Sequence, residues 1–235
     1  MIIIKPEAFI SDKGKNEENE DYIKYLSGKF YLVCDGVGGN SNGLIASKLL
    51  AESIYNLLSK SHNSSALIAV KEAEKLLQNY KKKYPNTERM SSTLALAQII
   101  ENNVLISWAG DSRVYQFRDG KIIYKTKDHT LVNEAVNNGV LSAVEALFHP
   151  DANELTKSIK GTRKPVTLDQ ILIEDKREND YFLVCTDGII ESWIDSDLES
   201  LFSELKSSQC IINELNKNCK IFSNDNYSAI VFQLE

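Results

Sequence analysis

Two apolar stretches of this chain end alike, Phe30-Tyr31-Leu32-Val33-Cys34-Asp35-Gly36 and Tyr181-Phe182-Leu183-Val184-Cys185-Thr186-Asp187-Gly188. Each is a run of β-forming residues, which predicts a strand buried on both faces. Each then places an aspartate and a glycine where the strand leaves the core. A carboxylate at such a point is costly unless something cationic meets it. Together with Asp225-Asn226 and Asn19-Glu20-Asp21, these strand ends predict acidic side chains gathered around metal ions.

Length and composition set the broad class of protein. The 235 residues, 43% of them hydrophobic, suffice for one well-buried core, so we expect a single domain over residues 1–235. Apolar runs are too short for a membrane-spanning helix, and the N-terminus lacks the features of a signal peptide, which predicts a cytoplasmic protein without a membrane partner. A net charge of -6 argues against a nucleic-acid-binding surface.

The four cysteines have neither zinc-site spacing nor the pattern of a disulfide framework. Cys34 and Cys185 end the two apolar stretches and are predicted to be small core residues. Cys210 and Cys219 lie in a predicted helical region. Free thiols fit a reducing compartment.

The periodicity of the chain indicates its fold class. Strands outnumber helices, hairpins occupy the middle of the chain and helices come in pairs, which favours an α+β protein with antiparallel sheets and helices outside them. We expect strands at 9–11, 30–34, 94–100, 104–109, 114–117, 122–124, 166–173, 181–185 and 228–234. We expect helices at 44–59, 64–84, 130–137 and over most of 195–217, a glycine-rich turn at 36–43, and irregular structure at 12–20 and 140–165.

The order of the acidic motifs resembles that of the metal-dependent type 2C serine/threonine protein phosphatases, in their compact bacterial form. The resemblance covers nearly the whole chain. It rests on six ordered stretches: Ser11-Asp12-Lys13-Gly14 with Asn19-Glu20-Asp21; Asp35-Gly36-Val37-Gly38-Gly39 with Ala46-Ser47; Met90-Ser91-Ser92-Thr93-Leu94; Gly110-Asp111-Ser112-Arg113-Val114-Tyr115 with Asp128-His129-Thr130-Leu131-Val132; Thr186-Asp187-Gly188-Ile189-Ile190-Glu191; and Asp225-Asn226-Tyr227-Ser228.

The resemblance implies a fold and an activity. The fold is a four-layer α-β-β-α sandwich, with two central antiparallel sheets flanked by helix pairs. The activity is hydrolysis of phosphoserine and phosphothreonine in proteins by a hydroxide bound between two metal ions, with a third ion in bacterial members. Ligands that are all oxygen favour Mn²⁺ or Mg²⁺ over zinc, and two such ions can activate water and clamp the phosphoryl group.

The resemblance also implies a role for each residue of the motifs. Asp35 would bridge the two ions, the Gly36 carbonyl would bind one, and Asp187 and Asp225 would bind the other. Glu20 would contact the ions directly or through water, and Asp21 would act in catalysis by hydrogen-bonding metal-bound waters. Asp111 and Glu191 would hold the third ion. Gly38-Gly39 would form a tight turn, and Asn226 would orient ligands.

Each residue also has a simpler interpretation. An Asp-Gly pair after a strand is usually a turn, and the same holds for Gly110-Asp111-Ser112. Glu191 could be a helix-start carboxylate, and His129 and His149 are better explained as hydrogen-bonded structural residues. Only the joint pattern favours the catalytic interpretation.

The chain departs from the family pattern where substrate phosphate binds. Many members carry an arginine four residues before the glutamate of the Asn-Glu-Asp motif, and this chain has Asn16 there, beside Lys15. Either is a candidate phosphate contact, although a lysine cannot make a two-pronged planar contact. Asn40 and Leu44 stand where bacterial members commonly have histidine and glutamate.

These departures leave alternatives open. The protein is either an active phosphatase acting on a phosphoprotein, and opposing a serine/threonine kinase, or a catalytically weak regulatory module on the same scaffold. A phosphomonoesterase for small molecules would use the same site. The retained Asp35, Asp187 and Asp225 favour the active enzyme, because a scaffold has no need for carboxylates that repel one another.

Overall fold

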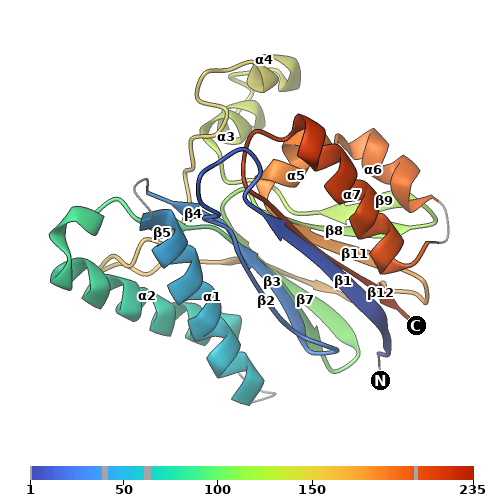
Figure 1. Cartoon of the computed structure of the whole chain (residues 1–235), viewed down its shortest axis with the longest axis horizontal. Coiled ribbons are helices and arrows are strands. Elements are labelled where there is room, and N and C mark those ends of the chain that lie inside the picture. The colour runs from blue at the N-terminus through green and yellow to red at the C-terminus, as the bar shows by residue number, and fades with distance from the viewer. Residues whose placement is uncertain (1, 39–41, 61–64, 204–205) are drawn as a thin grey trace.

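A computed structural model describes residues 2–38, 42–60, 65–203 and 206–235 of the chain. Two five-stranded sheets face one another, and helices cover the outer face of each (Figure 1). Gly39 and Asn40, part of the predicted glycine-rich turn, lie outside the described residues, as does Ser64 at the predicted start of the second helix.

The first sheet contains both chain ends and has the strand order β1-β12-β11-β8-β9, with every pair antiparallel. Its central strand is one of the two stretches quoted above, and all five of its residues are buried. The strands are β1 (Ile4–Asp12), β8 (Arg113–Arg118), β9 (Lys121–Lys125), β11 (Tyr181–Cys185) and β12 (Tyr227–Leu234).

The second sheet has the order β10-β7-β6-β3-β2 and is also antiparallel throughout. The other quoted stretch forms β3, again with every residue buried. The strands are β2 (Tyr22–Leu26), β3 (Phe30–Cys34), β6 (Leu94–Ile100), β7 (Asn103–Ala109) and β10 (Asp169–Ile173). A two-stranded ribbon joins β4 (Gly36–Val37) to β5 (Ser91–Ser92) directly after β3.

Three clusters of buried apolar side chains hold the four layers together. One fills the space between the sheets, where Tyr31 stacks on Phe232 with ring centroids 4.1 Å apart. Another lies between the second sheet and the helices α1 (Asn42–Lys60) and α2 (Ala66–Lys83). The last lies between the first sheet and α5 (Asp187–Ser192), α6 (Asp195–Phe202) and α7 (Ser208–Phe222). The predicted four-layer sandwich is confirmed, and β3 and β11 are wholly apolar because both faces of each sheet are covered.

The segment from 130 to 156 stands out from this sandwich, at the top of Figure 1. It carries the short helices α3 (Leu131–Asn137) and α4 (Ala143–Leu147). The segment returns on itself through an antiparallel bridge between Thr130 and Leu155, and the Leu131 N–H donates to the Glu154 carbonyl at 2.9 Å. We call residues 130–156 the protruding segment.

Several predicted elements differ from the structure. The strand β2 was not predicted, α4 lies in a region predicted to be irregular, and the strand predicted at 166–173 begins only at Asp169. The helical region 195–217 is two helices. A short 3-10 turn, Pro85–Thr87, follows α2. No helix within the described residues is long and apolar enough to cross a membrane.

Candidate metal-binding site

The predicted acidic residues come together at one end of the two sheets. Asp35 follows β3, Asp187 begins α5 directly after β11, and Asp225 precedes β12. Asp111 lies between β7 and β8, and Glu20 precedes β2. A cavity of about 570 Å³ opens at this end, and it is lined by Asn16, Glu20, Asp35, Gly36, Asp111, Asp187, Asp225 and Asn226 among others. Antiparallel pairing brings these ends together, because the C-terminus of one strand lies beside the N-terminus of its neighbour.

Asp21 directly follows Glu20 in the chain and is only 4% exposed. Its Oδ2 accepts a hydrogen bond of 2.7 Å from the Thr186 hydroxyl, whereas its Oδ1 has no partner among the described residues. Burial raises the pKa of Asp21 to about 7, against the lowering effect of the Thr186 and Ser228 hydroxyls. A buried, half-satisfied carboxylate is costly, so the position favours a cation nearby.

At the other carboxylates, repulsion between like charges adds to burial in raising the pKa. Removal from water, followed by repulsion from Asp187 and Asp21, holds the pKa of Asp35 well above its usual value. Removal from water and repulsion from Asp111 do the same for the pKa of Asp187. Burial and the nearby Asp128 carboxylate raise the pKa of Asp111 to about 6, and its Oδ1 has no partner in the described part of the chain. This mutual repulsion is what divalent cations would relieve.

Glycines let the backbone close around Glu20. A Cβ on Gly43 would lie 2.5 Å from Glu20 Oε2 and 2.4 Å from the Gly36 carbonyl oxygen, so only glycine fits at the start of α1. Burial raises the pKa of Glu20, and hydrogen bonds from the backbone N–H groups of Leu44 and Gly43 oppose the rise. The Gly36 N–H in turn donates to the Glu20 carbonyl at 3.2 Å. The glycines therefore bring Glu20 and the Gly36 backbone to the same edge of the cavity.

Asp225 already has hydrogen-bond partners. Its Oδ1 accepts from the Asn16 side-chain amide at 2.9 Å and from the Asn226 N–H at 2.7 Å. The side chain of Asn226 accepts from the Glu20 N–H at 2.8 Å and donates to the carbonyls of Lys13 and Glu18, each at 2.9 Å. Asn226 thus fastens the loop after β1 to the loop before β12.

Lys15 and Glu191 lie at the outer edge of the site. The Lys15 ammonium donates to Asn224 Oδ1 at 2.9 Å rather than pointing into the cavity that Asp35 lines. The Asn224 side-chain and backbone N–H groups donate to the two oxygens of Glu191 at 2.9 and 2.8 Å, and Ser223 donates to one of them at 3.1 Å. Burial raises the pKa of Glu191, but these hydrogen bonds outweigh it and leave the pKa below its usual value. The predicted role of Glu191 in binding a third ion stays a prediction.

The donor set fits Mn²⁺ or Mg²⁺. The cavity offers carboxylate oxygens and the Gly36 carbonyl, and buried oxygens of Asp21 and Asp111 lack partners. Within residues 2–38, 42–60, 65–203 and 206–235, however, no three Asp, Glu, His or Cys side chains are placed to hold one ion together. Asp225 Oδ1 accepts from Asn16 and from Asn226, so a metal ion on that oxygen would compete with these two hydrogen bonds.

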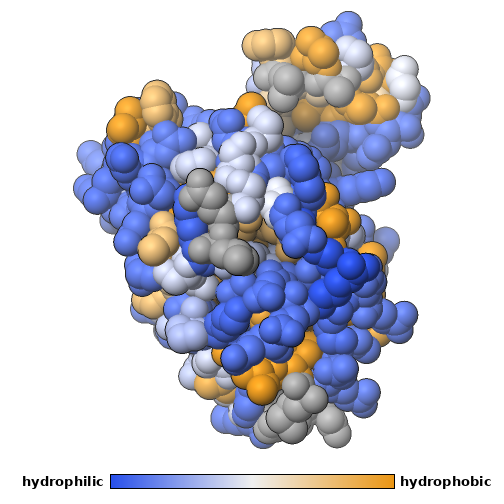
Figure 2. Space-filling model, turned by 90° about the vertical axis from the view of Figure 1, so that its right-hand side faces the viewer, coloured by the Kyte–Doolittle hydropathy of each residue, from blue (hydrophilic) through white to orange (hydrophobic). Residues whose placement is uncertain are grey.

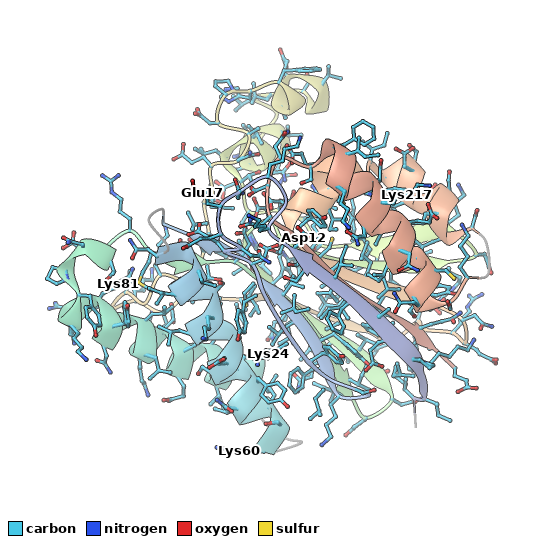
Figure 3. The ribbon with its side chains drawn as sticks, viewed as in Figure 1. Asp12, Glu17, Lys24, Lys60, Lys81 and Lys217 are labelled. Atoms are coloured by element: carbon cyan, nitrogen blue, oxygen red, sulfur yellow. The ribbon has the colours of Figure 1, made fainter. Side chains whose placement is uncertain are left out.

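Several cationic side chains lie away from the acidic end. Figure 3 labels Lys24, Lys60, Lys81 and Lys217, which lie on β2 and on α1, α2 and α7, away from the loop that carries Glu17 beside the cavity. Arg113 lowers the pKa of Asp111, but it also donates to both oxygens of Asp128 at 2.7 and 2.6 Å. Charge compensation at the aspartates is therefore left to a bound cation.

Sequence reasoning missed three residues that support the site. Thr186 holds Asp21, the Thr93 hydroxyl accepts from the Asp35 N–H at 2.9 Å, and Asn224 holds Glu191. Each lies inside or beside a quoted motif, so its position in the sequence was a signal. Nothing in the sequence indicated the hydrogen-bond partner of each residue, because the contacts join residues far apart in the chain.

Comparison with known proteins places this arrangement in a family. The family model of protein phosphatase 2C matches residues 11–214. The chain belongs to the protein phosphatase 2C family. The predicted family is confirmed, and the match covers the candidate ligands up to Glu191 but stops before Asp225.

Curated relatives share the family over most of the chain. A putative protein phosphatase of Mycoplasma genitalium is 27% identical over 96% of this chain and 94% of its own length. The serine/threonine phosphatase stp of Listeria monocytogenes is 26% identical over 85% of this chain and 83% of its own. The serine/threonine protein phosphatase PstP of Mycobacterium tuberculosis is 28% identical over 76% of this chain. The matched region spans 35% of the length of PstP.

Solved structures confirm the fold. The crystal structure of Mycobacterium tuberculosis PstP superposes with a TM-score of 0.87 and 26% identity, covering 99% of this chain and 100% of that one. Staphylococcus aureus Stp1 has a TM-score of 0.87 and 26% identity over 97% of this chain and 94% of its own. A structure of the PstP catalytic domain with two manganese ions has a TM-score of 0.83 and 25% identity over 100% of this chain and 99% of its own.

Proposed function

We propose that this protein is a metal-dependent serine/threonine protein phosphatase that uses two Mn²⁺ or Mg²⁺ ions, with room for a third. The observation that carries the proposal is the group of carboxylates at one end of a protein phosphatase 2C fold, with a buried oxygen of Asp21 and one of Asp111 unpartnered. Relatives named as serine/threonine phosphatases, and one solved with two manganese ions, support the activity and the metal.

Asp35 would bind both ions, the Gly36 carbonyl one of them, and Asp187 and Asp225 the other. When bound, the ions supply a Lewis acid that activates water and neutralises phosphoryl charge. The protein holds the ligands in place: Thr93 fixes the Asp35 backbone, and the first turn of α5 fixes Asp187. Asp111 and Glu20 line the same cavity and complete the donor set.

Asp21 and Asn16 would each contribute one polar contact to the reactants. Thr186 holds one oxygen of Asp21, so the free oxygen can accept a hydrogen bond from water. Asn16 lines the cavity with Asp225 and is the neutral residue at the position of the family's phosphate-binding arginine. An amide donor holds phosphate less tightly than a guanidinium, so we expect weak binding of phosphate itself. Lys15 remains a candidate phosphate contact.

A phosphoserine or phosphothreonine protein would be the substrate, and a serine/threonine kinase would oppose the enzyme, in the cytoplasm. The test compares wild-type protein with Asp187→Asn and Asp225→Asn, in Mn²⁺, on p-nitrophenyl phosphate and on a phosphothreonine peptide. Each variant should lose at least about 100-fold in kcat, because an amide is a poor ligand for a hard cation. Circular dichroism should show an unchanged fold.

Asp197→Asn serves as the matched control, since Asp197 is an exposed residue in the first turn of α6, away from the cavity that Asp35 lines. Near wild-type turnover by Asp187→Asn at saturating Mn²⁺ would refute the ligand assignment. A wild type that hydrolyses p-nitrophenyl phosphate but no phosphopeptide would favour a small-molecule phosphomonoesterase. A wild type that binds Mn²⁺ without turnover would favour a regulatory module.

A further inference from the structure

Two buried hydroxyl groups connect Asp35 to the segment that carries Asp111. The Thr93 hydroxyl accepts a hydrogen bond of 2.9 Å from the Asp35 N–H, and it also lies 2.7 Å from the Ser112 hydroxyl oxygen. Thr93 and Ser112 are 0% and 1% exposed, so the contact between them is shielded from water. Ser112 directly follows Asp111 in the chain, so these contacts run from one candidate metal ligand toward another.

Strand pairing explains why Thr93 meets this segment. The hairpin of β6 and β7 pairs Leu94 with Ala109, so Thr93 and Gly110, which come just before and just after these residues, lie across from one another. Gly110 has a φ of +107°, and a Cβ there would lie 2.6 Å from Thr93 Cγ2. Glycine therefore lets residues 110–112 approach Thr93 closely enough for the two hydroxyls to meet.

Residues 110–112 are held from another side by His129. The Gly110 N–H donates to His129 Nδ1 at 3.1 Å, and the His129 N–H donates to the Gly110 carbonyl at 3.0 Å. His129 immediately precedes the protruding segment, which stands away from the body at the top right of Figure 2. Contacts of Gly110 and Ser112 thus fix the chain on both sides of Asp111.

The two aspartates differ in how much they depend on the contact between the hydroxyls. Thr93 binds both backbone polar groups of Asp35, because its own N–H donates to the Asp35 carbonyl at 2.8 Å. The place of Asp111 relative to Asp35, by contrast, depends on the Ser112 hydroxyl. The two carboxylates also repel one another, so the contact opposes their separation. Its loss should therefore disturb Asp111 more than Asp35.

We infer that Thr93 and Ser112 are positioning residues, and that the contact between their hydroxyls sets the place of an ion at Asp111 relative to the ions at Asp35. The inference rests on the proposed function, which places ions at both aspartates. It adds that Ser112 acts through its neighbour in the chain. An ion at Asp111 should lose affinity when the contact is removed, whereas the ions held by Asp35 should keep theirs.

The test is calorimetric titration of the metal-free protein with Mn²⁺, which needs no turnover. Asp111→Asn identifies the ion at Asp111 as the binding step that this variant loses. Ser112→Ala should raise the Kd of that step at least roughly five-fold and change the Kd of the other steps less than about two-fold, because Thr93 still accepts from the Asp35 N–H.

Two variants of Thr93 separate the hydroxyl from the rest of the side chain. Thr93→Val has nearly the same shape but leaves the buried Asp35 N–H without its acceptor, so the Kd of every step should rise. Thr93→Ser keeps the hydroxyl and should bind Mn²⁺ as the wild type does. Ser107→Ala is the matched control, since Ser107 is a buried serine of β7 whose hydroxyl accepts from Gln170 at 2.8 Å and which does not line the cavity.

Three results would overturn the inference: unchanged Kd values in Ser112→Ala, an equal rise at every step in that variant, or no step lost in Asp111→Asn. Hydrolysis of p-nitrophenyl phosphate by the same proteins tests the proposed function separately. If there is no hydrolysis but Ser112→Ala weakens the Asp111 step alone, the proposed function fails and the positioning role stands. If hydrolysis requires Mn²⁺ and Ser112→Ala binds Mn²⁺ as the wild type does, the positioning role fails and the proposed function stands.

Discussion

At the scale of single residues, the acidic end holds more negative charge than its hydrogen bonds can compensate. Asp21 and Asp111 each keep one buried oxygen without a partner in the described residues, while Asp225 has two donors on one oxygen. The sequence motifs predicted that these carboxylates would meet. They did not predict the partner of each oxygen, because Asn16 and Asp225 lie at opposite ends of the chain and no periodicity connects them.

The contact between Asn16 and Asp225 leads to a prediction about metal affinity. Asn16→Ala removes one donor from Asp225 Oδ1, so this oxygen becomes available to a cation and the Kd for Mn²⁺ should fall roughly two- to five-fold, equal to about 0.5–1 kcal/mol for an exposed hydrogen bond. Calorimetric titration of the metal-free protein measures this Kd.

The matched control for that titration is Asn213→Ala. Asn213 lies on α7, where its side chain accepts a hydrogen bond from Gln209, away from the cavity. Its replacement should leave the Kd unchanged. An Asn16→Ala protein that binds Mn²⁺ as tightly as wild type or more weakly would show that the Asn16 contact does not compete with the ion.

At the scale of elements, the two apolar stretches were predicted to the residue, as β3 and β11. Their patterns are strong because helices cover one face of each strand and the opposite sheet covers the other. By contrast, α5 begins at Asp187 itself, a start that was not predicted. The strand β2 is half-buried along its whole length and shows no alternation. In both cases tertiary packing determined the secondary structure, because the local conformational preference of the residues did not.

His129, at the base of the protruding segment, makes several contacts with the body. The His129 ring stacks on Trp108 with centroids 6.1 Å apart, its Nδ1 accepts from the Gly110 N–H at 3.1 Å, and its Nε2 lies 3.2 Å from Asp169. The sequence-based expectation of a hydrogen-bonded structural histidine matches these contacts. Gly110 is also the neighbour of Asp111, so the histidine links the segment to the acidic end.

We predict that His129→Ala lowers the free energy of unfolding by about 1–2 kcal/mol, the cost of removing buried hydrogen bonds. Because the segment would lose its fixed position, kcat/KM for a phosphopeptide should fall more than kcat/KM for p-nitrophenyl phosphate. Chemical denaturation and steady-state kinetics give the two quantities. Equal losses on both substrates would mean that His129 serves the acidic end alone. His149→Ala is the control, since the side chain of His149 is more exposed and its ring accepts only from the nearby Asp151 N–H.

At the scale of the whole molecule, the fold holds carboxylates that repel one another at its acidic end. Burial and neighbouring carboxylates raise the pKa of Asp21 to about 7 and that of Asp111 to about 6, from an ordinary value of 3.8. In the folded protein these two carboxyls lose their protons only above their raised pKa values, whereas in the unfolded chain they lose them near pH 4. The metal-free protein should therefore lose stability as the pH rises from about 4 to about 7.

The free energy of unfolding of the metal-free protein should fall by at least about 1.4 kcal/mol over this pH range, the equivalent of one pKa unit. Thermal unfolding in excess chelator should give a lower Tm at pH 8 than at pH 5.5, and Mn²⁺ should raise the Tm more at pH 8, where the carboxylates are free of protons. A metal-free protein that is more stable at pH 8 than at pH 5.5 would contradict the assignment of these charges. Asp187→Asn in chelator should weaken the pH dependence, because it removes one of the repelling groups.

The central claim is that this acidic end binds divalent metal ions and thereby hydrolyses phosphate esters. The most direct measurement is release of phosphate from a phosphothreonine peptide by metal-free protein, while Mn²⁺ is titrated in and then removed by chelator. We expect no release without metal, a rise that saturates with Mn²⁺, and full loss on chelation. Release that persists in chelator, or none at saturating Mn²⁺ in folded protein, would contradict the claim.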